Sequence, residues 1–174
     1  MGKELTDHHY TQLNEASLRE FRLRLPTKPE LSDRLYFLLE ETETENILAS
    51  GYLKPIHPVI FAHTIFSFLN IGGIIANEKG KGYGKQVMIA IRDYLIFSDK
   101  IGLGFCSPRN QVFYEKCGFK VDTISTQRFI YKNEGEERTA EGQYIIYQDS
   151  SDCFMEKVLS QRDQEIFVPD PTIW

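Results

Sequence analysis

The sequence predicts a mixed α/β fold in a single domain that covers residues 1–174. Apolar runs of strand length alternate with segments of helical periodicity, which is the pattern of a sheet with helices packed on it. A glycine-rich loop separates one of these strands from the longest predicted helix. One domain commonly holds roughly 100–200 residues, and we find no internal repeat or low-complexity linker in the chain.

The first third of the chain is predicted to hold a helix and a hairpin. Apolar residues recur at helical spacing over 14–25, and Pro26 is expected to end that helix. Residues 5–10, just before it, are expected to form a short strand. Apolar runs at 35–39 and 46–53 flank an acidic turn, which indicates a β-hairpin.

The middle of the chain is expected to alternate strand, helix and strand. Residues 59–75 are mostly apolar and β-branched or aromatic, which favours a buried strand, and Gly72-Gly73 marks a bulge or a close backbone approach. A helix is expected after the glycine-rich loop, up to about residue 97, because its apolar residues form one stripe. Residues 101–106 follow as a strand.

The last third is expected to begin with a short helix through Lys116, capped by Ser107 or Asn110, and a strand that opens at Phe119. Residues 132–142 are charged and contain glycine, so a loop is expected there. The remaining predicted elements are a strand, a helix and an extended tail, at 143–148, 151–161 and 165–174.

The composition excludes several classes of protein. The chain carries 20 Lys and Arg against 25 Asp and Glu, a net charge of −5, and has no basic block, so we expect no nucleic-acid partner. No apolar run approaches the roughly 20 residues of a membrane span, and the N-terminus lacks the apolar core of a signal peptide. Three cysteines without a CxxC pair, and histidines without ligand-spaced partners, favour a reduced, cytoplasmic protein with no metal site.

The segment from Lys79 to Lys85, KGKGYGK, is the most informative part of the chain. A glycine-rich loop between a strand and a helix exposes backbone N–H groups at the positive helix end, which suits a phosphate. A solvated surface turn is the other interpretation. The loop is not a P-loop, because Gln86 stands where Ser or Thr is needed. A dinucleotide-binding loop is also disfavoured, since Gly84 comes one residue early.

Two motifs in this region resemble those of the GNAT superfamily of N-acetyltransferases. Residues 79–84 are similar to its acyl-CoA loop, in which Arg or Gln is followed by two residues, Gly, one residue, and Gly or Ala; here Lys79 replaces the Arg or Gln. Residues 110–119, NQVFYEKCGF, are similar to its second signature. The close match covers about residues 66–121. More narrowly, the pattern resembles the branch that includes aminoglycoside 2-prime N-acetyltransferases.

The resemblance implies an acyl-CoA N-acyltransferase fold: a central, mostly antiparallel sheet with a splayed parallel strand pair, flanked by helices. It implies acetyl-CoA as co-substrate, with its pyrophosphate on the glycine-rich loop and its pantetheine arm against the strand before it. For the two glycines of that strand a simple bulge is the alternative, and for the asparagine of the second motif a plain helix cap. The implied cofactor-binding residues are Gly72, Gly73, Ile74, Lys79, Gly80, Lys81, Gly82, Tyr83, Gly84, Lys85 and Asn110.

Tyr114 is the candidate catalytic residue. The leaving thiolate benefits from a proton donor, and the resemblance implies that a tyrosine at this motif position hydrogen-bonds the CoA sulfur as the general acid. Aromatic packing beside Phe113 and Phe119 is the alternative. The attacking amine must be neutral, whereas an alkylamine with a pKa near 10 is almost wholly protonated at pH 7. A base or a water chain must therefore remove its proton.

The identity of that base is open. Many members of the superfamily carry a glutamate on the strand before the loop, and the corresponding residue here is Asn70, which has no useful basicity. A water relay without a protein base is the preferred interpretation, and the candidate substitutes are His63, Glu40, Glu41 and the C-terminal carboxylate of Trp174. Cys106 is expected to line the acyl site rather than form an acyl-cysteine, because no His or acid partner is evident.

The sequence therefore predicts an acyl-CoA-dependent N-acetyltransferase that moves acetyl to a primary amine by direct attack. The acceptor is expected to be a small cationic molecule or a peptide amine. The acidic balance supports this, as do the acidic residues of the first hairpin, which the resemblance places toward the acceptor. The candidate acceptor contacts are Glu40, Glu41, Asn70, Cys106 and Trp174. The alternative is a non-catalytic acyl-CoA-binding module on the same fold. Either a monomer or a homodimer is expected.

Overall fold

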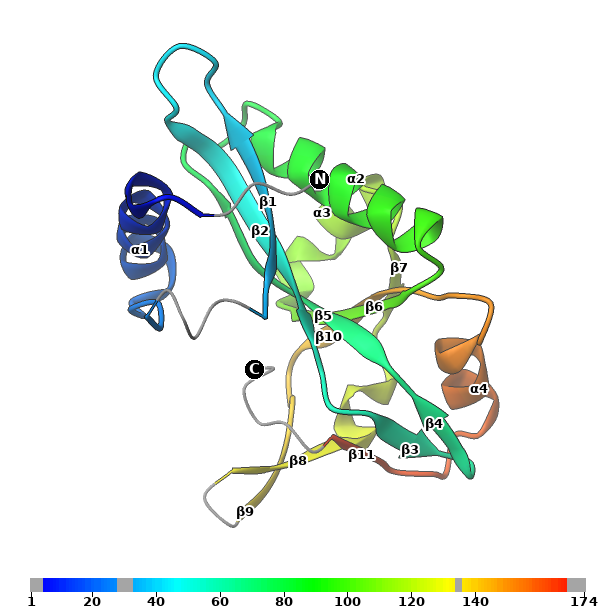
Figure 1. Cartoon of the computed structure of the whole chain (residues 1–174). Coiled ribbons are helices and arrows are strands. Elements are labelled where there is room, and N and C mark those ends of the chain that lie inside the picture. Colours follow the sequence, from blue (N-terminus) through cyan, green and yellow to red (C-terminus); the bar gives the residue numbers. More distant parts are fainter. Residues whose placement is uncertain (1–4, 28–32, 134–135, 169–174) are drawn as a thin grey trace. The chain divides into compact units, whose positions relative to one another are not determined.

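The computed structural model describes residues 5–27, 33–133 and 136–168 (Figure 1). Contacts divide the chain into two compact units, Met1–Lys54 with Gly72–Ile91 and Pro55–Ile71 with Arg92–Trp174. Among the described residues, no helix combines the length and the apolar composition needed to cross a bilayer.

The first unit is a three-stranded arrangement with a helix on each side. Its strands lie in the order β1-β2-β5, and α1 and α2 lie on opposite sides of the β1-β2 hairpin (Figure 1). β1 and β2 are antiparallel, with Leu35 opposite Leu53 and Tyr36 opposite Tyr52. The elements are α1 (Asp7–Phe21), β1 (Leu35–Glu40), β2 (Ile47–Pro55), the end of β5 (Phe68–Ala76) and the start of α2 (Tyr83–Phe97).

Helix α1 begins earlier than the apolar spacing indicates, and the strand expected at residues 5–10 is wrong. Thr6 caps the helix: its side chain accepts from the His9 backbone N–H, and the His9 side chain accepts from the Thr6 backbone N–H. Such a capping box usually has Glu or Gln in the place of His9, so the sequence signal is weak. The helix ends at Arg22, which adopts a left-handed conformation at φ 60°, several residues before Pro26.

Helix α2 packs closely on the sheet because Gly51 has no side chain. A carbon added there would lie 2.6 Å from Ile74 Cδ1 and 3.1 Å from Val87 Cγ1. The predicted apolar stripe of this helix is confirmed at Val87, Met88, Ile91 and Leu95, which are almost completely buried, but not at Tyr94, which is exposed. This packing fixes the start of α2, and with it the glycine-rich loop, against the strands of the first unit.

The second unit holds strands in the order β5-β6-β10-β7, a β3-β4 hairpin and a β11-β8-β9 sheet. β5 and β6 are parallel for only three pairs, from Phe68 opposite Ile101 to Asn70 opposite Leu103, and both strands continue beyond that ladder. The elements are β3 (Val59–Phe61), β4 (Thr64–Phe66), β6 (Ile101–Cys106), η2 (Pro108–Asn110), α3 (Gln111–Lys116), β7 (Lys120–Asp122), η3 (Ser125–Arg128), β8 (Phe129–Asn133), β9 (Glu136–Thr139), β10 (Tyr144–Gln148), α4 (Phe154–Ser160) and β11 (Ile166–Val168).

The predicted fold class is confirmed. The main sheet is mostly antiparallel, because β1 with β2, β6 with β10, and β7 with β10 all run in opposite directions. β5 and β6 form a parallel pair whose ladder ends at Asn70 and Leu103. Within the second unit, a core of large apolar residues surrounds Phe154, whose ring lies 4.9–6.5 Å from the rings of Phe61, Phe66, Phe68 and Phe129.

Two predicted elements of the second unit differ from the structure. Residues 59–75 were expected to be one strand, but residues 59–66 form a hairpin before β5, because Ala62 and His63 make a turn at φ 48° and 62°. Residues 132–142 were expected to be a loop, whereas β8 and β9 pair antiparallel there. Glu137 and Thr139 of β9 are exposed, so this strand lacks the apolar alternation that signals a half-buried strand.

Candidate functional site

Asn77 anchors the glycine-rich loop within the first unit. Its backbone N–H donates to Leu48 O at 2.9 Å, and its side-chain amide donates to Ile47 O. The Arg19 side chain of α1 donates to the Asn77 side-chain oxygen. The loop therefore leaves the sheet at a fixed point, and sequence analysis missed this residue because one polar residue in a loop carries no distinctive signal.

The loop itself is open and glycine-dependent. Gly80 and Gly82 have φ of 81° and 80°, and a side-chain carbon added at either would meet no atom within 4 Å. Glycine is thus required by the backbone conformation and not by crowding. The Gln86 N–H donates to Gly82 O, so the N–H groups of the three residues before it precede the first helical hydrogen bond. These groups, at the positive end of α2, can receive an anion.

Lys79 forms an ion pair with Glu20 of α1. Its ammonium nitrogen lies 3.0 Å from both carboxylate oxygens. This pair offsets one of the three positive charges of the loop. Lys81 and Lys85 are exposed and supply the remaining positive charge beside the start of α2.

Gly72 and Gly73 lie beneath the ring of Tyr52. A carbon added at Gly72 would lie 2.6 Å from Tyr52 Cζ, and one added at Gly73 would lie 2.5 Å from Tyr52 Cε1. Gly73 also has a φ of 61°, which marks an irregularity in β5. The close approach suspected at these glycines is therefore made by a side chain of the neighbouring strand, whereas a pantetheine contact of their backbone is a prediction that the structure does not test.

A cluster of Arg34, Tyr36 and Tyr52 lies beside these glycines and was not found by sequence analysis. The guanidinium carbon of Arg34 lies 4.6 Å from the centre of the Tyr52 ring, and the two tyrosine rings lie 5.7 Å apart. Burial raises the pKa of Tyr36 and of Tyr52, which the nearby Arg34 charge partly offsets. Both phenols thus stay neutral at pH 7. Tyrosines in a strand are ordinarily explained by strand propensity, so nothing in the sequence singled them out.

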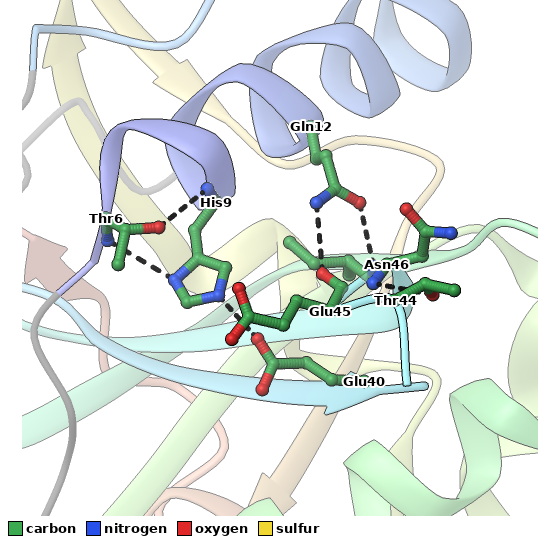
Figure 2. Close-up of polar contacts among 8 residues, drawn as sticks. Thr6, His9, Gln12, Glu40, Thr44, Glu45 and Asn46 are labelled. Carbon is green, nitrogen blue, oxygen red and sulfur yellow. Dashed lines mark hydrogen bonds and ion pairs between the residues drawn. The ribbon is translucent and has the colours of Figure 1, made fainter. Parts of the chain in front are cut away.

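Glu40, a predicted acceptor contact, belongs to a polar network between α1 and the hairpin turn (Figure 2), and Glu41, another, adjoins this network through Thr44. Glu40 Oε1 lies 2.6 Å from His9 Nε2. Glu41 accepts from the Thr44 hydroxyl at 2.5 Å. Gln12 of α1 extends the network, because its amide donates to Glu45 O and its oxygen accepts from the Ile47 N–H (Figure 2).

The position of Glu40 separates it from the Tyr52 cluster. Glu40 follows Tyr36 by four residues along β1, which corresponds to about 13 Å of strand. It lies opposite Ile47, whose carbonyl accepts from Asn77, at the end of the hairpin that adjoins the glycine-rich loop. The acidic turn and Gly72-Gly73 thus lie at different heights of the first unit.

Tyr114 lies on α3 in the second unit and is buried. Burial raises the pKa of its hydroxyl, and the neighbouring Cys106 and Cys117 raise it further. The centre of the Tyr114 ring also lies 5.1 Å from that of Phe113, so the predicted packing contact is present whether or not the hydroxyl has a chemical role. A phenol in this state stays protonated and can donate a hydrogen bond at neutral pH.

The glycine of the second motif, Gly118, is required by packing within the second unit. Gly118 has a φ of 88°, and a carbon added there would overlap the Arg92 guanidinium. Arg92 in turn donates to Cys117 O at 2.9 Å, which fixes the end of α3. Ser107 is the N-cap residue of η2 and Asn110 that of α3, so the predicted cap positions are confirmed, but neither side chain makes a capping hydrogen bond.

The remaining predicted site residues differ in exposure. Asn70 is buried in β5, and Cys106 is buried at the end of β6, where burial raises the pKa of its thiol to about 11. His63 is exposed at the tip of the β3-β4 turn. Trp174 lies outside the described residues. Among the described residues, no group of three or more His, Cys, Asp or Glu side chains is arranged to hold a metal.

Each unit contains part of the predicted set of site residues. The first unit holds the candidate pantetheine and pyrophosphate residues on β5, the loop and the start of α2. The second unit holds Asn70, Cys106, Asn110 and Tyr114.

No family model matches the sequence, and no curated protein matches it either. Solved structures match the fold. ElaA of Escherichia coli is 16% identical at a TM-score of 0.55, over 84% of this chain and 93% of that protein. An acyl-CoA N-acyltransferase from Pseudomonas aeruginosa is 14% identical at a TM-score of 0.54, over 83% and 93% of the two chains. An N-acetyltransferase from Staphylococcus aureus Mu50 is 15% identical at a TM-score of 0.55, over 84% and 95%.

These likenesses show that the chain has the fold of the GNAT N-acyltransferases. The fold that the two motifs implied is therefore confirmed. The narrower resemblance to the aminoglycoside branch stays a prediction.

Proposed function

We propose that this protein is an acyl-CoA-dependent N-acetyltransferase that transfers acetyl from acetyl-CoA to a primary amine by direct attack. The observation that carries the proposal is the glycine-rich loop. There is open space at Gly80 and Gly82, and the loop leads into the N–H groups at the start of α2 that precede the first helical hydrogen bond. In a chain with an N-acyltransferase fold, this arrangement suits the pyrophosphate of acyl-CoA.

In this proposal the loop and the start of α2 bind the pyrophosphate. The N–H groups of Tyr83, Gly84 and Lys85 donate to its oxygens, and Lys81 and Lys85 add charge. Lys79 contributes less while it is paired with Glu20. The backbone of Gly72 to Ile74 binds the pantetheine arm, and Asn110 contributes a further contact from the second unit.

Tyr114 is proposed as the donor to the leaving sulfur. Because its pKa is raised, it is a weaker acid than a free phenol, and full proton transfer to a thiolate with a parent pKa of about 8.5 is uphill. Its contribution is therefore a hydrogen bond that strengthens as negative charge develops on sulfur. Protonated Cys106 is a poor nucleophile, which supports direct attack over an acyl-cysteine.

The proton of the attacking amine is proposed to leave through water. Asn70 stands at the position where a carboxylate base would be expected, and its amide cannot accept the proton. His63 is at the tip of an exposed turn, and Glu40 is engaged by His9. Neither observation supports a protein base.

The acceptor is proposed to be a small amine with further positive charge. The support is the net charge of −5 and the exposed carboxylates of the hairpin turn, Glu41, Glu43 and Glu45. Glu40 supports it less than the sequence suggested, since its carboxylate already pairs with His9. The three free cysteines support a reducing, cytoplasmic setting.

The test replaces Gly82 with Asp, which places a negative charge in the loop. Asp tolerates the left-handed conformation better than most residues, and the space at Gly82 is open, so the variant is expected to fold. Calorimetry with acetyl-CoA is expected to show at least a hundredfold weaker binding.

Gly142→Asp is the matched control, because Gly142 has a φ of 75° and equally open surroundings in the turn between β9 and β10. This variant should bind acetyl-CoA as the parent protein does. Equal affinities for both variants would reject the loop as the pyrophosphate site. Tight acetyl-CoA binding without turnover of any amine would favour the non-catalytic module instead.

A further inference from the structure

The ring of Tyr52 fills the space beside Gly72 and Gly73 in the first unit. A carbon added at Gly72 would lie 2.6 Å from Tyr52 Cζ and 2.7 Å from the hydroxyl oxygen, and one added at Gly73 would lie 2.5 Å from Cε1. Carbon atoms pack best at about 3.5–4.0 Å, so the ring lies directly against the main chain of β5. The two glycines therefore allow the ring to approach the backbone this closely.

Two neighbours hold the Tyr52 ring in this position. The guanidinium carbon of Arg34 lies 4.6 Å from the ring centre, and the centre of the Tyr36 ring lies 5.7 Å from it. A hydrogen bond joins the Arg34 and Tyr36 side chains to each other. The Tyr52 ring is thus packed between the backbone of β5 and these two side chains, and it forms a fixed surface.

The ring covers one face of β5 and leaves an edge of that strand open. Gly51, the residue before Tyr52, faces α2, so the Tyr52 ring lies on the side of the strands away from α2. The ladder that the structure describes between β5 and β6 ends at Asn70, whereas β5 continues to Ala76. A ligand can therefore lie along that edge, while the face beside the two glycines is already filled.

The inference drawn from this arrangement rests on the proposed function, which sets the direction of acyl-CoA along β5. The pyrophosphate is placed on the loop after Ala76, and the pantetheine arm runs back along the strand from Ile74 to Gly72. The thioester and its acyl group then lie at the far end of that path. Gly72 is four residues from Ala76, about 13 Å of strand, so the acyl group ends beside the Tyr52 ring.

We propose that Tyr52 restricts the acyl donor to acetyl-CoA, because its ring occupies the space that a longer acyl chain needs. An acetyl group carries one methyl beyond its carbonyl carbon, whereas propionyl and butyryl groups add one and two methylenes. A single methylene in an apolar pocket changes recognition by roughly 10–200-fold. Tyr52 is thus a residue that determines specificity for acyl length, and it takes no part in the chemical step.

The experiment measures binding by calorimetry and needs no amine acceptor. The parent protein should bind acetyl-CoA at least about tenfold more tightly than butyryl-CoA, with propionyl-CoA in between. Tyr52→Leu removes the ring and should reduce this preference to about twofold or less, mainly by strengthening the binding of butyryl-CoA. Tyr52→Phe keeps the ring and should keep the parent preference. If Tyr52→Leu fails to fold, Tyr52→Met replaces it, because an unbranched side chain adapts to the same space.

Tyr10→Leu is the matched control, because it removes a half-buried tyrosine from α1 of the same unit and should keep the acetyl preference. Equal binding of acetyl-CoA and butyryl-CoA by the parent protein would overturn the proposal, and so would an acetyl preference that persists without the Tyr52 ring. In either case, acetyl-CoA binding that Gly82→Asp abolishes would leave the proposed function intact. If none of the three acyl-CoA compounds binds the parent protein, the proposed function fails together with this inference.

Discussion

The ammonium nitrogen of Lys79 lies 3.0 Å from each carboxylate oxygen of Glu20. Lys79 occupies the motif position where the GNAT pattern has Arg or Gln, so a charge expected to serve the cofactor is engaged by helix α1. The pair is largely exposed, and such pairs contribute less than about 1 kcal/mol to stability. Under the proposed function, the pair therefore matters for binding, because the Glu20 carboxylate would oppose an incoming pyrophosphate.

Replacing Glu20 with Gln should strengthen acetyl-CoA binding about two- to fivefold at low salt, because Lys79 is released and a negative charge is removed. Screening should shrink the gain between about 0.05 and 0.3 M salt. Calorimetry at both salt concentrations is the measurement. Glu15→Gln removes an exposed carboxylate from the same helix and should change the affinity less. Unchanged affinity in Glu20→Gln would show that Lys79 does not meet the cofactor.

The conformation of the glycine-rich loop could be predicted from sequence because its glycines are required locally. Gly80 and Gly82 adopt left-handed conformations that other residues rarely adopt, so the glycines of the motif indicate the backbone conformation directly. The turn between β3 and β4 is the opposite case. Ala62 and His63 adopt left-handed conformations without glycine, and an apolar run that is in fact a hairpin therefore resembled one strand.

The Arg34 and Tyr36 groups could not be predicted for a different reason. What brings them together with Tyr52 is ring stacking and a hydrogen bond between the Arg34 and Tyr36 side chains, and this depends on packing that no local pattern encodes. The same holds for the His9 contact with Glu40, which joins residues 31 positions apart in the sequence. The Glu40 carboxylate, which the sequence suggested to be free in an acidic turn, therefore helps to hold α1 through this contact.

Replacing Tyr114 with Phe should lower kcat about 10²–10³-fold with little change in acetyl-CoA affinity, because in the proposed mechanism the hydroxyl acts on the developing thiolate. Burial raises the pKa of Tyr114 above 10, so its hydroxyl stays protonated below that pH. In the parent protein kcat/KM should therefore rise with pH as the acceptor loses its proton, with no descending limb from Tyr114.

Steady-state rates from pH 6 to 10 check both expectations for Tyr114. Tyr94→Phe removes a hydroxyl from α2 and serves as the control, which should keep kcat within about twofold. A Tyr114→Phe variant within threefold of the parent rate, on the order of 0.6 kcal/mol, would remove this residue from the mechanism.

Replacing Phe154 with Ala should destabilise the protein by about 3–5 kcal/mol, because the ring is fully buried and contacts four other rings. Chemical denaturation followed by circular dichroism measures the change. Phe97→Ala is the matched substitution, and since Phe97 is 92% exposed it should change the unfolding free energy by no more than about 0.5 kcal/mol. Similar losses for both variants would mean that the ring cluster around Phe154 does not carry the core of the second unit.

The acidic turn should make the acceptor KM depend on ionic strength if the acceptor is cationic. Glu43 and Glu45 are exposed, whereas Glu40 pairs with His9 and Glu41 accepts from Thr44, so the first two are the carboxylates to change without disturbing the network. Because screening shortens to about 8 Å at physiological salt, the parent KM should rise several-fold from about 0.02 to 0.3 M salt while kcat moves little. A Glu43→Gln and Glu45→Gln double variant should start from a higher KM and show a flatter dependence on salt.

Glu141→Gln with Glu165→Gln removes the same charge from exposed positions of the second unit and should follow the parent protein. If both double variants keep the parent salt dependence, the attraction does not come from this turn, and a flat KM in the parent protein would reject a cationic acceptor.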